Sequence, residues 1–582
     1  MIEEQAQEKA KRKFNKMVDN PMLEDYSLRY APRSFRKWSE YACASAALGG
    51  IAYLVDFAIG ASITVAYGFT SATLAILLAA ATIFLTGIPI SYYAAKYNID
   101  MDLLTRGAGF GYLGSTITSL IYASFTIIFF ALEASVMAQA LTLFFGMPLT
   151  LAYLICALAI IPLVIFGMTL LSKLQMWTQP IWFVLIIAPF IALTVVEPGI
   201  YAEWASFAGQ ESETAGFSVL GFGLAAGIAL SLIAQIGEQV DYLRFMPEKT
   251  PENRFKWWAA VIAAGPGWVV LGALKQMGGA ILAVFIISEV QNPTQATEPI
   301  EQFVRSFELF IPSAFWALAV ATFLVVLSQI KINVTNAYSG SLSWSNFFSR
   351  IFHWHPGRVV WVVFNVGIAL ALMLGGVFGF LNFVLGFYSN VAIAWIGAVV
   401  ADLVINKPFL KVGPSYIEFK RAHLYQINPV GFGAMIAGSA VSIPAFFGAF
   451  GSYAQAFSPY LALVIAFVLS PALALLTKGK YYVAREGSSS ELLENSDERY
   501  RLRECVQCGQ EYETPRCPTA HSTRETSAPC APPWTETVTT CVRNKAPTAR
   551  RSRCTCSEVR SRESSSSTGN RGEWDHASPV CT

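Results

Sequence analysis

The sequence predicts an all-α polytopic membrane protein, and three observations carry that prediction. First, 54% of the 582 residues are hydrophobic and only 14% are charged, with a mean hydropathy of +0.46, which excludes an ordinary soluble protein. Second, apolar runs of about 20 residues, the length that crosses a bilayer, recur along the chain. Third, Lys and Arg gather in alternate connections between these runs. The net charge of +2 says little about partners.

The apolar runs predict twelve transmembrane helices, an even number that places both chain ends on one side. Because alternate connections carry almost all of the Lys and Arg, the positive-inside rule predicts cytoplasmic termini and a cell (inner) membrane location. The amino-terminal segment has no short apolar core followed by a cleavage site, so the first span is expected to direct insertion. The expected spans are 42–68, 72–95, 112–145, 149–170, 175–196, 217–243, 257–288, 311–340, 358–378, 380–404, 429–450 and 458–477.

Composition divides the chain into four expected segments. A cytoplasmic amino-terminal segment (1–41) precedes a twelve-helix membrane domain (42–477). A cytoplasmic linker with a Cys-x-x-Cys motif (478–513) and a disordered tail (514–582) follow. The tail contains no Leu, Ile, Phe or Met and is too poor in apolar residues to form a core.

Two spans are unusual helices. The first contains "ALGGIAYLVDFAIGAS" with Asp56, and the sixth contains "GFGLAAGIALSLIAQIGEQVDYLRF" with four glycines. Glycine and polar residues at membrane depth predict unwound backbone that lines a cavity. Spans one and six are five apart, which predicts a five-plus-five inverted repeat with two extra helices. The alternative is that these glycines only permit close helix packing.

Four motifs, in order, resemble the nucleobase:cation symporter family of purine, cytosine, allantoin and hydantoin permeases. The resemblance covers roughly residues 20–485 and implies the leucine-transporter fold, with a substrate site at the bilayer midplane and alternating access. The motifs are "LLTRGAGFGYLGS" (103–115), "DYLRF" (241–245), "SQIKINVTN" (328–336) and "FVLGFYSNVAIAWIGAVVADLVINKP" (383–408).

The resemblance also implies substrate-binding residues, and here the chain departs from its family. Phe129 matches an aromatic that stacks on a flat heterocycle, whereas Glu133 stands where the family has a glutamine. Asp56 falls at or beside a first-span glutamine, and the sixth-span tryptophan has no counterpart. Two added acids favour a ligand with amine or amidine donors over a neutral nucleobase.

In the family the eighth span supplies hydroxyls to a sodium ion, and Lys331 falls at that place here, with Ser328 and Asn333 nearby. An ammonium there would exclude sodium, and the opposite charge expected to pair with it is Asp56. This predicts sodium-independent function, either proton-coupled through Lys331 or a carboxylate, or as an exchanger or sensor. The alternative is that Lys331 snorkels or ties helices together.

Other polar residues carry weaker predictions. Ser231, Gln235 and Asn336 are candidate substrate contacts, although polar helix packing explains each nearly as well. Glu238 and Asp241 are expected to form a solvated interfacial pair with Arg244 near the end of span six. Lys275 is expected to pair with an acid on another helix and receives no functional role.

The tail poses a separate question. Cys505 and Cys508 resemble half of a zinc ribbon or knuckle. A structural zinc site needs four ligands, and these two cysteines supply only half of them, so no zinc or other cofactor is expected. The sequence after about residue 513 is compositionally arbitrary, which favours an out-of-frame or truncated end over a natural disordered tail.

The predicted function is that of a secondary transporter, a permease of a small nitrogenous solute such as a nucleobase-like or amine-bearing compound. The alternative is a transporter-like sensor whose cytoplasmic signalling module is lost. No phosphate-binding loop or nucleophile elbow occurs in the membrane body, so an enzyme is not expected. The expected partners are a small molecule and lipid, without nucleic acid, and the oligomeric state is open.

Overall fold

The computed structural model describes residues 30–31, 33, 36–211, 216–352, 354 and 356–484, and the backbone of three short strands beyond residue 500. Its membrane body is helical, as predicted. The helices are α2 (Glu40–Gly49), α3 (Val55–Tyr97), α4 (Met101–Thr105), α5 (Gly114–Phe145), α6 (Leu149–Ile165), α7 (Gly167–Val196), α8 (Ile200–Ala205), α9 (Val219–Ala229), α10 (Ile236–Leu243), α11 (Arg254–Ala264), α12 (Trp268–Val290), α13 (Pro293–Ala296), α14 (Pro299–Glu308), α15 (Ala314–Ile351), α16 (Arg358–Leu374), α17 (Leu381–Ala401), α18 (Pro429–Phe446), α19 (Ser452–Ala456) and α20 (Ser458–Leu476).

Tighter and wider turns extend or join several of these helices. The 3-10 segments are η4 (Leu230–Gln235), η5 (Val377–Phe380) and η7 (Arg421–His423), and the π-helical segments are η3 (Arg106–Phe110) and η6 (Asp402–Leu410).

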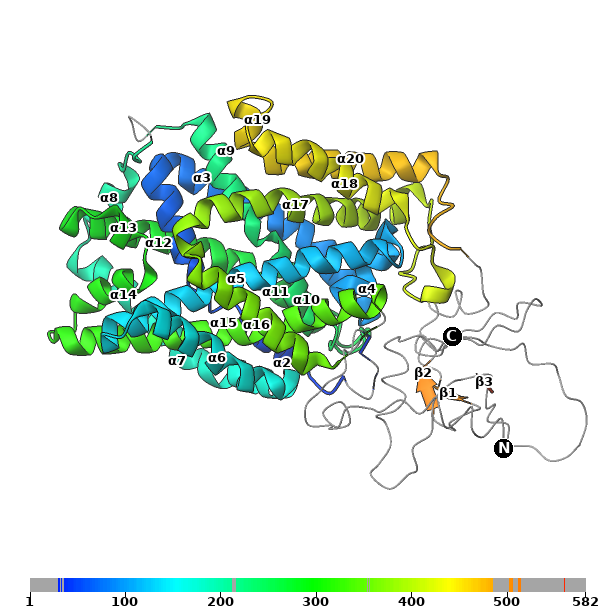
Figure 1. Ribbon diagram of the computed structural model, residues 1–582, viewed down its shortest axis with the longest axis horizontal. Coiled ribbons are helices and arrows are strands. Elements are labelled where there is room, and N and C mark those ends of the chain that lie inside the picture. Colours follow the sequence, from blue (N-terminus) through cyan, green and yellow to red (C-terminus); the bar gives the residue numbers. More distant parts are fainter. Residues whose placement is uncertain are drawn as a thin grey trace, which may run out of the picture.

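The long helices lie roughly side by side along the longest axis of the molecule (Figure 1). On one side α17, α18 and α20 pack together, and on the other α15 packs against α16, α6 and α7. Between these layers α5 packs against α15, and α3 packs against α12. The contacts of α3 with α12 and of α5 with α15 bring together helices that carry buried polar side chains.

Within the described residues nine helices are long and apolar enough to cross a membrane, and two shorter apolar helices accompany them. The count of twelve spans and the inverted repeat therefore stay predictions. Gly68 divides α3, because its φ of 77° and ψ of 173° interrupt the helix. This division falls at the predicted boundary between the first and second spans.

Both predicted positions are irregular, but only the first is unwound, since the sixth span tightens to 3-10 geometry, and the predicted cavity lining stays a prediction. In the first span α2 ends at Gly49 and α3 begins at Val55, and residues 50–54 between them are not helical. In the sixth span the 3-10 segment η4 separates α9 from α10. Changing from α to 3-10 geometry alters which backbone groups bond and which way side chains point. Each interruption places polar groups at membrane depth.

Glycine brings α3 and α12 into backbone contact. A Cβ at Gly60 would overlap the carbonyl group of Gln276, and a Cβ at Gly279 would overlap the backbone of Phe57. Small residues at such crossings let two membrane helices approach closely. The side chains on this side of α12 therefore reach the break between α2 and α3.

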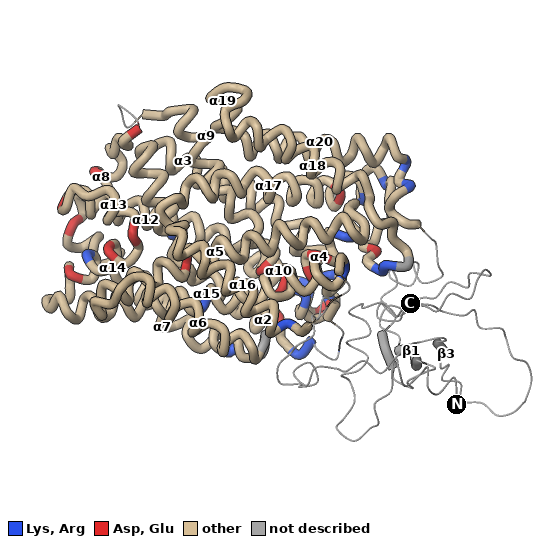
Figure 2. Tube along the Cα trace, in the orientation of Figure 1, with Lys and Arg blue, Asp and Glu red and all other residues tan. Residues whose placement is uncertain are grey.

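Charge is distributed unevenly along the bundle. Figure 2 shows Lys and Arg gathered mainly at one end, near α4 and the ends of α18 and α20, and acids gathered at the other, around α8, α13 and α14. This polarity agrees with the charge asymmetry from which cytoplasmic termini are predicted.

The predicted tail lies largely outside the described residues. Three strand segments of backbone are described there, with β1 (Leu502–Cys505) pairing antiparallel to β2 (Glu511–Glu513) and β3 (Val559–Arg560). Cys508 and the side chain of Cys505 are not described, so the half zinc site, the disorder and the altered reading frame stay predictions.

The contact of α3 with α12 predicts the effect of a single methyl group. Gly279→Ala should destabilise the protein by about 1–3 kcal/mol or more, because the new Cβ overlaps backbone that has no rotamer to escape into. Gly367→Ala on α16, where nothing lies within 4 Å of the added atom, is the matched control and should gain up to about 1 kcal/mol. Thermal unfolding in detergent measures both, and equal midpoints would contradict the close contact.

The acidic end of the bundle predicts a pH dependence. Burial and the neighbouring Glu301 carboxylate raise the pKa of Glu298, which precedes α14, to about 7 from an ordinary value of 4.5. Because the folded state favours the protonated Glu298, this residue adds to the free energy of unfolding at low pH. Its contribution is complete below pH 4.5 and is lost as the pH rises through 7. Glu298→Gln should flatten the unfolding midpoint between pH 5 and 8. Exposed Glu203→Gln on α8 should leave the wild-type slope unchanged.

Candidate substrate and ion site at the broken helix

The break between α2 and α3 leaves backbone carbonyls without helical partners, and a lysine of α12 binds them. Lys275 Nζ donates to the carbonyl oxygens of Ile51 at 2.8 Å and Tyr53 at 2.9 Å. The same ammonium lies 3.6 Å from the centre of the Tyr53 ring, a cation–π contact. A cation at the carboxyl end of α2 also complements the negative end of that helix.

Asp56 completes the shell around this ammonium. Its Oδ2 lies 2.9 Å from Lys275 Nζ, and its Oδ1 accepts a hydrogen bond from Gln276 Nε2 at 2.9 Å. Asp56 is fully buried and Lys275 is 7% exposed. Three oxygens and one aromatic face thus hold a single positive charge inside the bundle.

Glu133 binds the other side of the break. Its Oε2 accepts hydrogen bonds from the backbone N–H groups of Leu54 and Val55, both at 3.3 Å, where α3 begins. An anion is favoured there because free N–H groups and the helix dipole make the end positive. The two helix ends at the break are therefore held by side chains of opposite charge, Lys275 from α12 and Glu133 from α5.

Several buried polar atoms around the two helix interruptions have no hydrogen-bond partner within the described chain. Leaving such an atom unpaired costs about 1–3 kcal/mol, so a cluster of them indicates a place for water or a bound solute. They are Tyr53 Oη, Glu133 Oε1, Ser231 Oγ, Glu238 Oε1, Gln329 Oε1 and Nε2, Asn333 Nδ2 and Asn336 Oδ1.

Of the predicted substrate residues in spans three and six, Glu133 and Ser231 contribute unpartnered atoms to this cluster. Phe129 is 3% exposed and packs against Phe125 with ring centroids 4.5 Å apart. Ser231 lies in η4, and Gln235 at the end of η4 donates through Nε2 to Glu238 Oε2 at 2.7 Å. The 3-10 segment η4 thus carries polar side chains into the protein interior.

Lys331 occupies a different place from the one predicted. Its Nζ donates to the carbonyl of Gln175 and to Thr178 Oγ1, both at 2.9 Å, so it ties α15 to α7. Gln175 Nε2 donates back to the carbonyl of Lys331 at 2.6 Å. The predicted pair of Lys331 with Asp56 is wrong, because Lys275 reaches the break first from the closely packed α12.

The other eighth-span residues divide between packing and the site. Ser328 Oγ accepts a hydrogen bond from Trp182 Nε1 at 2.9 Å, a link to α7 like that of Lys331. Asn336 Nδ2 donates to Asn333 Oδ1 at 3.4 Å, which leaves the other amide atom of each without a partner. The structure therefore does not gather Ser328, Lys331 and Asn333 around one point.

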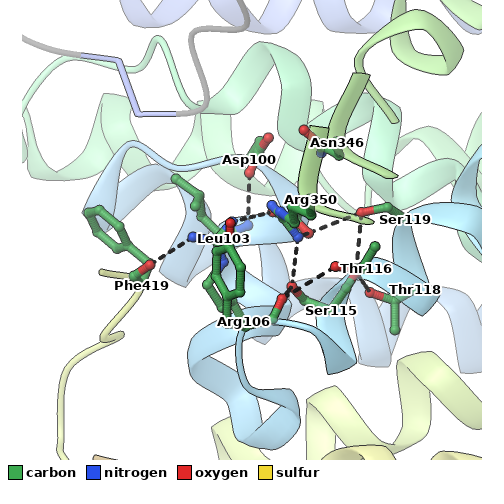
Figure 3. Close-up of polar contacts among 12 residues, drawn as sticks. Asp100, Leu103, Arg106, Ser115, Thr116, Thr118, Ser119, Asn346, Arg350 and Phe419 are labelled. Atoms are coloured by element: carbon green, nitrogen blue, oxygen red, sulfur yellow. Dashed lines mark hydrogen bonds and ion pairs between the residues drawn. The ribbon is translucent and has the colours of Figure 1, made fainter. Parts of the chain in front are cut away.

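A second polar cluster closes the basic end of the bundle. Asp102 of α4 accepts from Arg350 of α15, at 2.8 Å to its Oδ1, and pairs with Arg106 of η3 at 3.1 Å. Ser119 Oγ donates to Asp102 at 3.0 Å. Figure 3 shows the neighbouring hydrogen bonds by which Arg350 donates to Ser115 Oγ and Arg106 donates to the carbonyl of Phe419. These buried contacts join α4, η3, α5 and α15.

A small cleft of about 20 Å³ adjoins this cluster between α4, α5, α10, α15 and α17. Its lining includes Asp102, Tyr122 and Asp241. Asp241 is bound by Arg244 at 3.0 Å and by Ser339 at 2.7 Å. Arg244 is fully buried, which corrects the expected solvated pair, and Glu238 pairs instead with Gln235.

Comparison with known proteins identifies the family. Residues 30–468 match the model of the permeases for cytosine/purines, uracil, thiamine and allantoin. The chain belongs to this cytosine/purine permease family. No curated protein matches it.

Solved structures show the fold that this permease adopts. It is similar to the nucleobase-cation-symport-1 family transporter Mhp1, closed with bromovinylhydantoin bound, at 17% identity and a TM-score of 0.57 over 82% of this chain and 99% of the other. The inward-facing conformation of Mhp1 is similar at 18% identity with a TM-score of 0.54, over 82% of this chain and 97% of the other. A Na⁺-coupled sialic acid symporter in a substrate-bound outward-open state is similar at 14% identity with a TM-score of 0.51, over 79% of this chain and 94% of the other. The leucine-transporter fold implied by the motifs is confirmed.

The expected pairing of Lys275 with an acid on another helix is confirmed, and the partner is Asp56 of α3. The functional place of Lys275 and the burial of Glu238 were not predicted. Lys275 stands in "GALKQMGG", whose glycines signal a close helix contact, but the sequence does not say which helix supplies the partner. Glu238 is fully buried, although counting along a regular helix placed it near the membrane surface. Within the described residues no group of three or more His, Cys, Asp or Glu is arranged to hold a metal ion.

The two lysines predict contrasting mutants. Lys275→Met leaves the buried Asp56 carboxylate without its cation and should destabilise the permease by about 3–5 kcal/mol. Lys331→Met, the matched control, removes a charge bound only by a carbonyl and a hydroxyl in the described chain, and should cost less. Thermal unfolding in detergent compares them, and Lys275→Met/Asp56→Asn should recover part of the loss. A larger effect at Lys331 would contradict the assignment.

Proposed function

We propose that this permease carries a small nitrogenous solute, nucleobase-like or amine-bearing, across the cell membrane without sodium. The observation that carries the proposal is the ammonium of Lys275 in the break of the first span, bound by two carbonyls and one carboxylate. Membership of the permease family and the likeness to symporter folds support secondary transport. No comparison supports the sensor hypothesis.

Electrostatics supports independence from sodium. Carbonyl and carboxylate oxygens are the ligands that hard cations prefer, and here a covalently attached cation takes them. Two unit charges 4 Å apart repel by about 4 kcal/mol at an effective dielectric constant of 20. A sodium ion entering beside Lys275 would meet this repulsion and find its ligands engaged. The fixed-cation role predicted for Lys331 is thus transferred to Lys275.

Without sodium, transport is driven by protons or by exchange of one solute for another. Two groups are suited to proton coupling: Glu133, which has one unpartnered carboxylate oxygen, and Lys331, whose described contacts are uncharged. Lys331 also joins α15 to α7, so a change in its charge would alter a contact between two helices.

The solute is proposed to bind beside Phe129, where the unpartnered atoms of Tyr53, Glu133 and Gln329 gather close to the break. In the proposed orientation both termini lie in the cytoplasm, at the basic end seen in Figure 2. Reciprocal opening of the two ends would then move the solute, with the Asp102 cluster closing the cytoplasmic route.

Replacing sodium chloride by choline chloride should leave the unfolding midpoint of the wild-type permease unchanged, because Lys275 supplies the cation. Lys275→Ala vacates three oxygen ligands, so sodium chloride should raise the midpoint of this variant while choline chloride should not. The same salts should not alter uptake of any labelled solute, nucleobase or amidine, that wild-type proteoliposomes accumulate. A sodium requirement of the wild type would overturn the proposal.

A further inference from the structure

The central site contains more buried acids than its one bound cation can balance. Asp56, Glu133 and Glu238 are each fully buried. Lys275 contacts Asp56 directly, and no ion pair joins it to Glu133 within the described chain. An ionised acid without a counter-charge is costly at membrane depth. Each of the remaining two acids therefore either keeps a proton or binds a positive partner.

Glu133 is oriented to bind that partner with one oxygen. Its Oε2 is occupied by the backbone N–H groups at the start of α3, which fixes the carboxylate in place. Its Oε1 is buried and has no hydrogen-bond partner in the described chain, although the Gln329 side chain lies close to the carboxyl group. A carboxylate held by one oxygen and open at the other is preorganised to accept a hydrogen bond from a ligand.

Glu238 repeats this arrangement on α10. Its Oε2 accepts from Gln235 at 2.7 Å, whereas its Oε1 is buried and has no partner in the described chain. The α10 helix that carries Glu238 packs against α2 and α3, the two helices on either side of the break, and Glu133 of α5 binds the start of α3. The two open carboxylate oxygens therefore lie on helices that meet at the break.

We propose that the substrate is a planar organic cation with at least two N–H donors, of the amidinium, guanidinium or protonated aminoheterocycle class, bound between Glu133 and Glu238. This rests on the proposed function and names the class of its solute. The separated N–H groups of such a cation reach two acceptors at once, and its flat face suits the Phe129 ring. A neutral nucleobase would bind there only with both acids protonated.

Benzamidine and benzamide form a matched pair of probes, since they share size and shape but only benzamidine is a cation at neutral pH. Thermal unfolding of the full-length permease in detergent should show stabilisation by benzamidine and little by benzamide, cytosine or hydantoin. Proteoliposomes should accumulate labelled benzamidine. This comparison uses the wild-type protein and does not depend on whether a variant folds.

Glu133→Gln and Glu238→Gln should each weaken benzamidine binding about tenfold or more, because each replaces a charged acceptor by a neutral one. Glu203→Gln, the same substitution on exposed α8, should bind as the wild type does. Monodisperse elution and an unfolding transition establish that each variant is folded. Benzamide should gain relative to benzamidine in the two site variants.

Three results would overturn this inference. One is benzamide, cytosine or hydantoin binding as tightly as benzamidine, which leaves the proposed permease function standing with a neutral solute. Another is benzamidine binding that neither glutamine variant weakens. The third is no binding by any of the four probes. Sodium dependence tests the proposed function separately, because it is measured on the unfolding midpoint without any solute.

Discussion

The structure depends on how a membrane helix can be broken without stranding its backbone. Residues 50–54 leave the helix at a depth where water is scarce, and unpaired carbonyl and N–H groups there are costly. Lys275 takes two of the carbonyls and Glu133 takes two of the N–H groups. Each charge also matches the helix end it faces. The break is stable because Lys275 of α12 and Glu133 of α5 supply hydrogen-bond partners for backbone groups that have none within the helix.

This arrangement explains why the acids and the lysine are found together. Asp56 is tolerable because Lys275 is beside it, and Lys275 is tolerable because three oxygens surround it. In this arrangement Glu133 uses one carboxylate oxygen to bind the backbone, and its other oxygen is available to a solute. Structural support and a place for a solute are therefore served by one set of side chains, and a substitution in the set acts on both.

The sequence was sufficient for the membrane class, the family, the fold and both helix interruptions, because apolar run length, glycine content and motif order are local signals. It was not sufficient for pairing inside the bundle. Whether Asp56 faces Lys331 or Lys275 depends on which helix approaches more closely, and that is decided by Gly60 and Gly279 meeting backbone across the interface. Glu238 was misplaced because the 3-10 turn before it breaks the regular count of residues along a helix.

The glycine contact between α3 and α12 has a mechanical consequence. Two helices in backbone contact have little room to slide past each other, so the first part of α3 and α12 form one rigid unit that includes the pair of Asp56 and Lys275. Glu133 belongs to α5, outside that unit, and holds α3 through two hydrogen bonds of 3.3 Å. The attachment at Leu54 and Val55 is therefore the looser of the two that hold the break.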